Sequence, residues 1–481
     1  LGLAGAGLGA ASAAAPVFHD LDELISSSPK SNYERPWYIK EREFKNPTTE
    51  VDWSILQAWG WNAPAVGTHI YNRAFMVYQG GLQSDQGTEY RVRELLAIGD
   101  QRQAKMNRLY DVGLTAGTPG FALRDCALYE GMAITRRNTQ SVPFEGKSVT
   151  TPEARGVPKW TGTPEEATHM VRAAAHVMGS PNIGVLELDA DTRKFYYPNT
   201  QVFEDIPADA GYETTEEWEY PYVDRRGAPV TKHTVRHIPN ACNYAVCYVV
   251  RQSSEITKRG YSRHNFASMS GYFHGPIIQQ RLMAFIKALG YQTYKGGMNV
   301  PMGIMCGTSE LGRINFHVTP EWGTAIRYTP PTATDLPLAP TKPIDAGIWE
   351  FCKTCKLCST HCSEFGEVES PISMDDEPTW EISGPWNRVG VKKWHHKWPA
   401  CKHCVVCMPS CVFTGNDAFG NREFSSIHNM IKGITAVTPI FNSFFTTMEG
   451  VFGYGLHDSP EECEAWWNRD LNTWPFDCIY W

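Results

Sequence analysis

Apolar and polar residues recur in helix-like and strand-like patterns through the middle of the chain. PEEATHMVRAAAHVMG (164–179) predicts a helix, because Pro and Glu open it, apolar residues follow at helical spacing and a glycine ends it. IIQQRLMAFIKALG (277–290) predicts a second, amphipathic helix with a glycine stop. IGVLEL (183–188) and NYAVCYVV (243–250) are typical of buried strands. This alternation up to about residue 345 predicts an α/β or α+β core.

The pattern changes on both sides of this core. Residues 16–50 are polar and punctuated by proline, and residues 51–165 mix helical patterns with Gly and Pro turns. The proline-rich stretch 330–343 is typical of a linker. We therefore expect five parts, namely a remnant of an export signal or flexible tail (1–15), an N-terminal wrapping unit (16–165), the core (166–345), a cysteine-rich unit (346–415) and a C-terminal wrapping segment (416–481).

The first residues, LGLAGAGLGAASAAA, resemble the end of an export signal. Ala11-Ser12-Ala13 fits an A-x-A cleavage site, whereas Pro16 argues against cleavage directly after Ala15. A flexible Gly/Ala tail is the alternative interpretation. No stretch of about 20 apolar residues occurs, so we expect no segment to span a bilayer.

Composition and charge narrow the classes of function. The 481 residues include 42% hydrophobic residues and carry a formal net charge of −8, without a long basic block. This balance argues against nucleic acid as a partner. The 16 tryptophans and 21 tyrosines predict a large aromatic core, with a minority as candidates for an apolar pocket.

Two cysteine runs have the same C-x2-C-x2-C-x3-C spacing. The first consists of Cys352, Cys355, Cys358 and Cys362, and the second of Cys401, Cys404, Cys407 and Cys411. Three thiolates two residues apart can hold one [4Fe–4S] cluster, whereas the fourth cysteine of each run ligates the other cluster. The spacing therefore predicts one cluster on Cys352, Cys355, Cys358 and Cys411, and a second on Cys401, Cys404, Cys407 and Cys362.

Zinc is the main alternative for these cysteines, but structural zinc sites usually use separated pairs of ligands. The bacterial ferredoxin pattern has proline after the fourth cysteine, where this chain has Ser363 and Val412. Proline there shapes the turn and is not a ligand, so we keep the two clusters. The other cysteines, Cys126, Cys242, Cys247, Cys306, Cys463 and Cys478, lack ligand spacing and are expected to be mostly buried thiols.

Two clusters form a short path for electrons, which must end at another protein or at a redox centre in the core. The core has no G-x-G-x-x-G after a strand and no P-loop, so a dinucleotide site is unsupported. No histidine fits the D-x-H-x-x-G pattern that supplies a lower ligand to cobalamin in mutases. This absence excludes only one way of holding a corrinoid.

The order of several motifs resembles the respiratory reductive dehalogenases. GYFHGPIIQQRLMAFIKALGY, SELGRINFHVTPEWGTAIR and TDLPLAPTKPIDAGIWEFCKTCKLC follow one another, and RPWYIKE and VFGYG occur near the two ends. The resemblance implies an α+β, nitroreductase-like core that buries a base-off corrinoid without a protein histidine on cobalt. A bacterial-ferredoxin-like unit with two [4Fe–4S] clusters would deliver electrons singly to it.

The resemblance also implies partners and a location. The substrate would be a small halogenated hydrocarbon, and electrons would come from a respiratory chain through a small integral-membrane anchor protein. The protein would be exported and lie peripherally on the outer face of the cytoplasmic membrane. Export of the folded, cofactor-loaded chain would let the thiols bind metal before they leave the cytoplasm.

Two site residues carry over from the family by motif. Its catalytic tyrosine lies one residue past a glycine before the helix that ends in LGY, which is Tyr272 here. Its arginine closes the PEFG-x-x-x-R segment, which here runs from Pro320 to Arg327 and has Trp322 in place of Phe. A free tyrosine has a pKa near 10, and a nearby arginine stabilises the phenolate, so the phenol becomes a better proton donor.

A third family residue, an asparagine after LGY, has no clean match, because GYQTYKGGMNVP is several residues shorter. Asn299 is our candidate, with Met298 or Tyr294 as alternatives for that space. The pair Gly296-Gly297 allows close backbone approach, either to the corrinoid or within a plain turn.

These expectations favour a reductive dehalogenase in which two electrons and one proton replace halogen by hydrogen in a small chlorinated alkane or alkene. One alternative is an epoxyqueuosine reductase, which would share the corrinoid core and clusters but would bind tRNA. A second alternative is a non-enzymatic electron-transfer subunit, which would hold no corrinoid.

Overall fold

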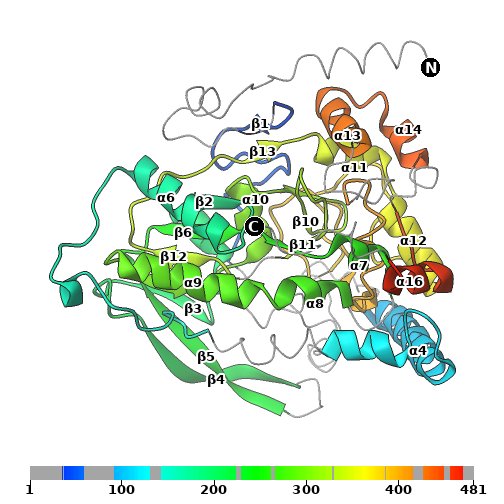
Figure 1. Ribbon diagram of the computed structural model, residues 1–481, viewed down its shortest axis with the longest axis horizontal. Coiled ribbons are helices and arrows are strands. Elements are labelled where there is room, and N and C mark those ends of the chain that lie inside the picture. Colours follow the sequence, from blue (N-terminus) through cyan, green and yellow to red (C-terminus); the bar gives the residue numbers. More distant parts are fainter. Residues whose placement is uncertain are drawn as a thin grey trace.

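The computed structural model describes ten stretches of the chain. These are residues 35, 37–58, 92–130, 142–223, 229–261, 266–327, 330–384, 386–414, 426–448 and 455–469. Within them, helices and strands mix without regular βαβ alternation, and most strand pairs are antiparallel, so the fold is α+β (Figure 1).

A four-stranded antiparallel sheet forms the centre of the core. Its strand order is β2 (Ile183–Glu187), β6 (Tyr244–Tyr248), β12 (Thr332–Thr334) and β8 (Thr293–Lys295). The strands are apolar or β-branched and mostly buried, as expected for a sheet covered on both faces. Strands β2 and β6 confirm the two runs predicted from sequence.

Helices α6 (Pro164–Val177) and α9 (Gly275–Ala288) cover one face of this sheet and confirm the two predicted helices. Thr163 and Glu166 form a capping box at the start of α6, in which each side chain accepts the backbone N–H of the other. Gly290 adopts a left-handed φ of 95° just after α9, which explains the glycine stop.

The opposite face of the sheet is covered by shorter elements. The 3-10 helix η2 (Thr192–Phe195) and helix α10 (Asn299–Met305) pack there with Phe144 and Tyr294. A second sheet has the order β3 (Gln201–Glu204), β5 (Pro229–Pro239) and β4 (Tyr212–Val223), of which β4 and β5 form the long hairpin in Figure 1.

The linker predicted at 330–343 is wrong over its first part. Residues 332–334 are strand β12, which lies between β6 and β8 and is fully buried. The prolines that flank Thr332–Thr334 end the strand on both sides but do not prevent three small or β-branched residues from pairing. The stretch is therefore part of the core, and two of its later apolar residues, Leu336 and Leu338, are buried too.

Further short elements connect the core to the cysteine-rich part. They are η1 (Glu153–Arg155), β7 (Val250–Arg251), α7 (Ser254–Lys258), α8 (Phe266–Tyr272), β9 (Glu310–Leu311), β10 (His317–Val318), β11 (Ile326–Arg327) and β13 (Ile344–Asp345). The cysteine-rich and C-terminal parts contain α11 (Ile348–Thr354), α12 (Leu357–Gly366), η3 (Trp398–Ala400), α13 (Ser426–Val437), α14 (Asn442–Thr447) and α16 (Pro460–Trp467).

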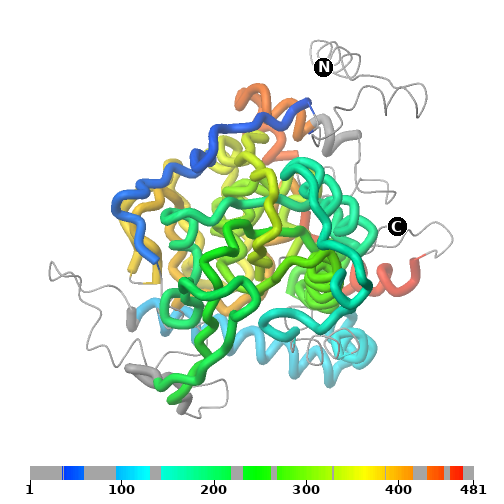
Figure 2. Tube along the Cα trace, turned by 90° about the vertical axis from the view of Figure 1, so that its left-hand side faces the viewer, coloured from blue at the N-terminus to red at the C-terminus, as the bar shows by residue number. Residues whose placement is uncertain are grey.

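N-terminal residues run along the outside of these parts. Strand β1 (Lys40–Glu41) pairs with β13, and residues 37–58 continue over the core surface, as the blue segment of Figure 2 shows. The 25-residue helix α4 (Val92–Ala116), which the sequence patterns did not predict, packs against η3 and α12. Residues 123–130 are also helical.

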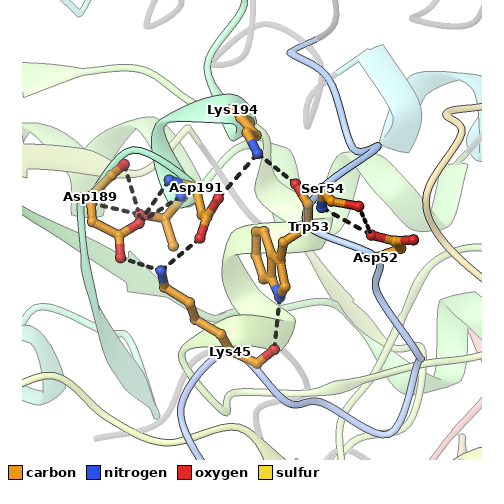
Figure 3. A network of polar contacts seen from close by, with 8 residues as sticks. Lys45, Asp52, Trp53, Ser54, Asp189, Asp191 and Lys194 are labelled. Carbon is orange, nitrogen blue, oxygen red and sulfur yellow. Dashed lines mark hydrogen bonds and ion pairs between the residues drawn. The ribbon is translucent and has the colours of Figure 1, made fainter.

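A polar network fastens this N-terminal segment to the core (Figure 3). Lys45 forms ion pairs with Asp189 and Asp191, the latter at 2.9 Å, and Lys194 donates to the backbone oxygen of Trp53 at 2.7 Å. The Trp53 indole donates back to the Lys45 backbone oxygen at 3.2 Å. The segment is thus held by both its backbone and its side chains.

Candidate active site

The structure brings Tyr272 and Arg327 together. Tyr272 is the last residue of helix α8. Arg327 lies on strand β11, where it pairs with Val250 of strand β7. The guanidinium carbon of Arg327 lies 5.3 Å from the centroid of the Tyr272 ring. A cation at this distance is attracted by the ring and favours negative charge nearby.

Close packing of α8 against β11 makes this approach possible. A Cβ added at Gly271 would lie only 2.7 Å from Cγ of Arg327, so the helix tolerates no side chain there. One turn earlier, Ser268 accepts a hydrogen bond from Nη2 of Arg327 through its hydroxyl. The glycine that the family motif places before the tyrosine therefore has a packing reason.

Arg327 also contacts the second cysteine run. Both of its terminal nitrogens lie 3.5 Å from Sδ of Met408, and its guanidinium carbon lies 5.4 Å from the Phe316 ring centroid. Met408 follows Cys407 directly, and Phe316 and Cys407 pack against the same buried cluster, which includes Met408. The arginine thus lies between the tyrosine helix and one group of cysteines.

The positive charge of Arg327 contributes to a lowered pKa at two buried histidines. Burial, together with the Arg327 charge, lowers the pKa of His317 to about 3 and that of His403 to about 4. His317 belongs to β10 and His403 to the second cysteine run. Both rings are therefore neutral at ordinary pH, and Arg327 keeps its charge beside them.

Four of the predicted cluster cysteines line one cavity. They are Cys352 on α11, Cys355 in the turn after it, Cys358 on α12 and Cys411 from the second run. Burial is the main cause that raises the pKa of Cys411 to about 12 and that of Cys358 well above its ordinary value. Burial therefore favours the neutral thiols, whereas a bound metal would favour thiolates.

The other four cysteines form a second group. Burial is the main cause that raises the pKa of Cys401 and of Cys404 to about 12. The nearby Cys362 also raises the pKa of these two thiols and that of Cys407. Helix α12 thus carries Cys358 to one group and Cys362, about one turn later, to the other. These neighbours agree with the crossed grouping that the spacing predicts, and both the grouping and its metal ligation stay predictions.

These groups fit a cluster better than a single ion. Among the described residues, no three His, Cys, Asp or Glu side chains converge as they would on one metal ion. A [4Fe–4S] cluster receives each of its four thiolates on a separate iron, so its ligands surround a larger volume. The four cysteines of the first group line one common cavity, as the ligands of one cluster would.

The remaining predicted residues lie around α10. Asn299 is the first residue of α10 and half-buried, whereas Tyr294 is a core residue whose hydroxyl donates to Ala208 at 2.7 Å. A Cβ at Gly296 would lie 2.9 Å from the Tyr196 ring, and Gly297 has a left-handed φ of 91°. The described close approaches at this glycine pair are to the Tyr196 ring at Gly296 and to Sδ of Met302 at Gly297.

A mostly apolar cavity of about 280 Å³ lies between the N-terminal segment, η2, α10 and residues 386–398. Met298 and Val300 line it on either side of Asn299, while Tyr272 and Arg327 are not among its lining residues. Its cations are Arg388 and Lys393, whose pKa values burial lowers to about 10 and about 8. Sequence reasoning missed both, because no local pattern marks a basic residue that folds against an apolar wall.

Other contributors were also missed. Met408 and Phe316 have no polar motif, and only their positions next to Cys407 and His317 could have marked them. Five of the six cysteines without ligand spacing are buried thiols as predicted, and Cys478 lies outside the described residues.

Comparison with known proteins places this geometry in context. A family model described as "Reductive dehalogenase subunit" matches residues 34–338. A chloroethene reductive dehalogenase of Dehalococcoides mccartyi strain VS is 32% identical over 99% of this chain and 96% of its own length. A trichloroethene reductive dehalogenase of Dehalococcoides mccartyi strain 195 is 29% identical over 97% of this chain and 94% of its own length.

More distant relatives and solved structures agree with the fold. A tetrachloroethene reductive dehalogenase of Sulfurospirillum multivorans is 27% identical over 66% of this chain and 62% of its own. A catabolic reductive dehalogenase solved with 3-bromo-4-hydroxybenzoic acid has a TM-score of 0.55 at 18% identity. The match covers 88% of this chain and 50% of the solved one, so the chain spans about half the length of that protein. A structure described as suggesting a mechanism for B12-dependent dehalogenation has a TM-score of 0.53, also at 18% identity.

Proposed function

Since the chain belongs to the reductive dehalogenase family, we propose that it replaces chlorine by hydrogen in a small chlorinated ethene. The two relatives that match nearly the full chain are named for chloroethene and trichloroethene. We therefore narrow the expected substrate from a chlorinated alkane or alkene to a chlorinated alkene. The reaction consumes two electrons and one proton and releases chloride. The approach of Arg327 to both Tyr272 and the second cysteine run carries the proposal, because it joins a proton donor to an electron path.

Two [4Fe–4S] clusters would supply the electrons. Cys352, Cys355, Cys358 and Cys411 would hold one cluster, and Cys362, Cys401, Cys404 and Cys407 the other, in a ferredoxin-like unit. The second group adjoins Phe316 and Met408, which contact Arg327, so we place it on the side of the reacting centre. The first group would then receive electrons from outside.

A base-off corrinoid in the nitroreductase-like core would complete the site. When bound, its cobalt supplies the low-potential electrons that cleave a carbon–halogen bond. Asn299, Gly296 and Gly297 remain our candidates for contacts to the corrinoid or to the substrate. The similarity to a protein described with B12-dependent dehalogenation supports this cofactor.

Tyr272 and Arg327 would handle the proton. The Tyr272 hydroxyl donates a proton to the carbon that loses chlorine, and the Arg327 guanidinium stabilises the phenolate that remains. Ser268 and Met408 fix the guanidinium in place, so that its charge stays beside the ring. Ser268 and Arg327 are buried, so the guanidinium is shielded from water.

We also propose that the protein acts outside the cytoplasmic membrane, docked to a small membrane anchor that passes electrons from a respiratory chain. The export-like N-terminal residues support this location. Within the stretches that the structure describes, no helix is long and apolar enough to cross a bilayer.

The decisive experiment measures chloride release from a panel of chlorinated ethenes, with reduced viologen as electron donor, by protein reconstituted with iron, sulfide and corrinoid. We expect turnover, with cobalt and about eight irons bound per chain. Release of no halide by a fully loaded protein would contradict the function. Specific tight binding of tRNA would favour the epoxyqueuosine reductase alternative instead.

A further inference from the structure

Each group of cysteines has a deeply buried arginine whose guanidinium donates to backbone oxygens of that group. Arg313, 1% exposed, lies in the turn between β9 and β10 of the core. Its guanidinium donates only to backbone oxygens around the first group, namely those of Cys352, Lys353, Cys355, Ser373 and Asp375, at 2.6–3.4 Å. The face of the guanidinium lies 4.4 Å from the Trp394 ring centroid. Arg313 therefore holds the loop that carries two of the four cysteines of this group.

Arg102 occupies the matching position at the second group. It comes from α4, is also 1% exposed, and donates to the backbone oxygens of Cys362 at 2.7 Å and Glu369 at 3.3 Å. Gly366 makes room for it, because a Cβ there would overlap the guanidinium. The Arg102 charge lowers the pKa of Cys362, Cys401 and Cys404 against the larger effect of burial.

Within the part of the chain that the structure describes, no carboxylate forms an ion pair with Arg102 or Arg313. Lys356 is the main cause that lowers the pKa of the exposed Asp376, and the Arg313 charge adds to it. Glu369, whose backbone oxygen accepts from Arg102, pairs with Lys397 through its carboxylate. A buried guanidinium that meets only carbonyl oxygens is costly unless an anion lies within reach. An iron–sulfur cluster with four thiolates is such an anion.

We propose that Arg102 and Arg313 are positioning residues that each set the reduction potential of a different cluster. Arg313 acts on the cluster of Cys352, Cys355, Cys358 and Cys411, and Arg102 acts on the cluster of Cys362, Cys401, Cys404 and Cys407. The inference rests on the proposed clusters. Each cluster gains one electron and one negative charge on reduction, so a fixed cation beside it favours the reduced state and raises its potential.

The test is an anaerobic redox titration followed by electron paramagnetic resonance on the full chain, with dithionite as reductant. We expect Arg102→Gln to lower one of the two midpoint potentials and Arg313→Gln to lower the other. A tenfold change in the one-electron equilibrium corresponds to about 59 mV, which such a titration resolves. Arg108→Gln is the matched control, because Arg108 lies on the same helix α4 but is exposed.

Lysine variants separate charge from shape. Arg102→Lys and Arg313→Lys keep the positive charge but lose the planar fork, so we expect potentials close to those of the unchanged protein. If a glutamine variant fails to assemble its cluster, the lysine variant decides. If the lysine variant assembles its cluster and both midpoint potentials are unchanged, the inference is supported. If the lysine variant also fails to assemble the cluster, the inference is overturned.

Other outcomes also decide the matter. Unchanged potentials in both glutamine variants, or an equal shift of both clusters by one variant, would overturn the role of these arginines while leaving the proposed function intact. An unchanged protein that binds far fewer than about eight irons after reconstitution would contradict the proposed clusters themselves.

Discussion

Arg327 connects more parts of the site than any other residue described above. Its side chain touches Tyr272 and Ser268 on α8, Phe316 before β10 and Met408 within the second cysteine run. A lysine could replace the charge but not the planar fork that makes these contacts simultaneously. The residue therefore fixes the distance between the proposed proton donor and the proposed inner cluster.

Removal of the Tyr272 hydroxyl should separate proton transfer from electron transfer. We expect Tyr272→Phe to lower kcat by about 100-fold or more, the usual contribution of a positioned general acid, with iron content unchanged. The measurement is chloride release under reduced viologen, with iron analysis of the same sample. Tyr212→Phe is the control, because Tyr212 is exposed on β4. Near-normal turnover of Tyr272→Phe would remove the tyrosine from the mechanism.

The glycine before this tyrosine permits a second test. Gly271→Ala should destabilise the protein by about 1–3 kcal/mol and reduce turnover, because the new Cβ overpacks Arg327. Gly433→Ala in α13 is the matched control, since its only close neighbour is the exposed Trp37 ring at 3.3 Å. That control should gain helix propensity of up to about 1 kcal/mol. Urea unfolding of both variants measures the difference, and a stabilised Gly271→Ala would contradict the close packing.

Residues of this kind were predictable only where a motif marks them. Tyr272 and Arg327 could be selected from sequence because the order of motifs is distinctive, and the structure places them together. Arg102 could not be selected, because an arginine in a polar helix gives no sign that it will be buried against cysteines from another element. Long-range packing supplies that information, and local patterns do not contain it.

Helix α11 depends on an acid from the core. Glu310 of β9 is fully buried and accepts backbone N–H groups of Ala346, Ile348 and Trp349 at 2.7–3.3 Å, at the start of α11. Burial is the main cause that raises the pKa of Glu310 to about 7. The first cysteine of the first run, Cys352, lies on this helix, so Glu310 connects core and cluster loop.

Glu310→Ala should therefore destabilise the protein by about 1–3 kcal/mol, the usual cost of leaving buried donors without an acceptor. The variant should also lose iron more readily than the unchanged protein on incubation with a chelator. Glu187→Ala at the exposed end of β2 should change neither property. Equal iron retention in both variants would show that α11 does not need this acid.

At the level of elements, periodicity worked for long helices and failed for short strands. Helices α6 and α9 show clear amphipathic spacing and matching caps, so their prediction was correct. Strand β12 has only three residues between prolines, which is too short for a periodic pattern. It is a strand because it pairs with β6 on one side and β8 on the other. The long helix α4 was not singled out, because it lies in a stretch where helical patterns mix with Gly and Pro turns.

Across the whole molecule, buried histidines predict sensitivity to acid. Burial is the main cause that lowers the pKa of His317, His395 and His396 to about 3 each. The unfolded chain protonates these rings below about pH 6.5, whereas the folded chain resists until about pH 3. Stability is therefore fully present above pH 6.5 and is lost as pH falls through this window.

Each such histidine contributes up to about 1.4 kcal/mol per pH unit to this loss. We expect urea midpoints, measured anaerobically at pH 7, 6 and 5, to fall steeply with pH. His317→Gln should flatten the slope, whereas His169→Gln should not, because His169 is exposed on α6. A flat profile in the unchanged protein would mean that these rings are not buried as described.

The position of Cys411 has a consequence for the order of synthesis. The first group of four cysteines begins at Cys352 but needs Cys411, whereas the second group is complete at Cys407. On a ribosome the earlier cysteines therefore wait for the later run, and the group that begins first is finished last. A nascent chain halted between the two runs would display Cys352, Cys355 and Cys358 without Cys411, and Cys362 without the other members of its proposed group. Timing of translation would thus become part of how the proposed clusters are assembled.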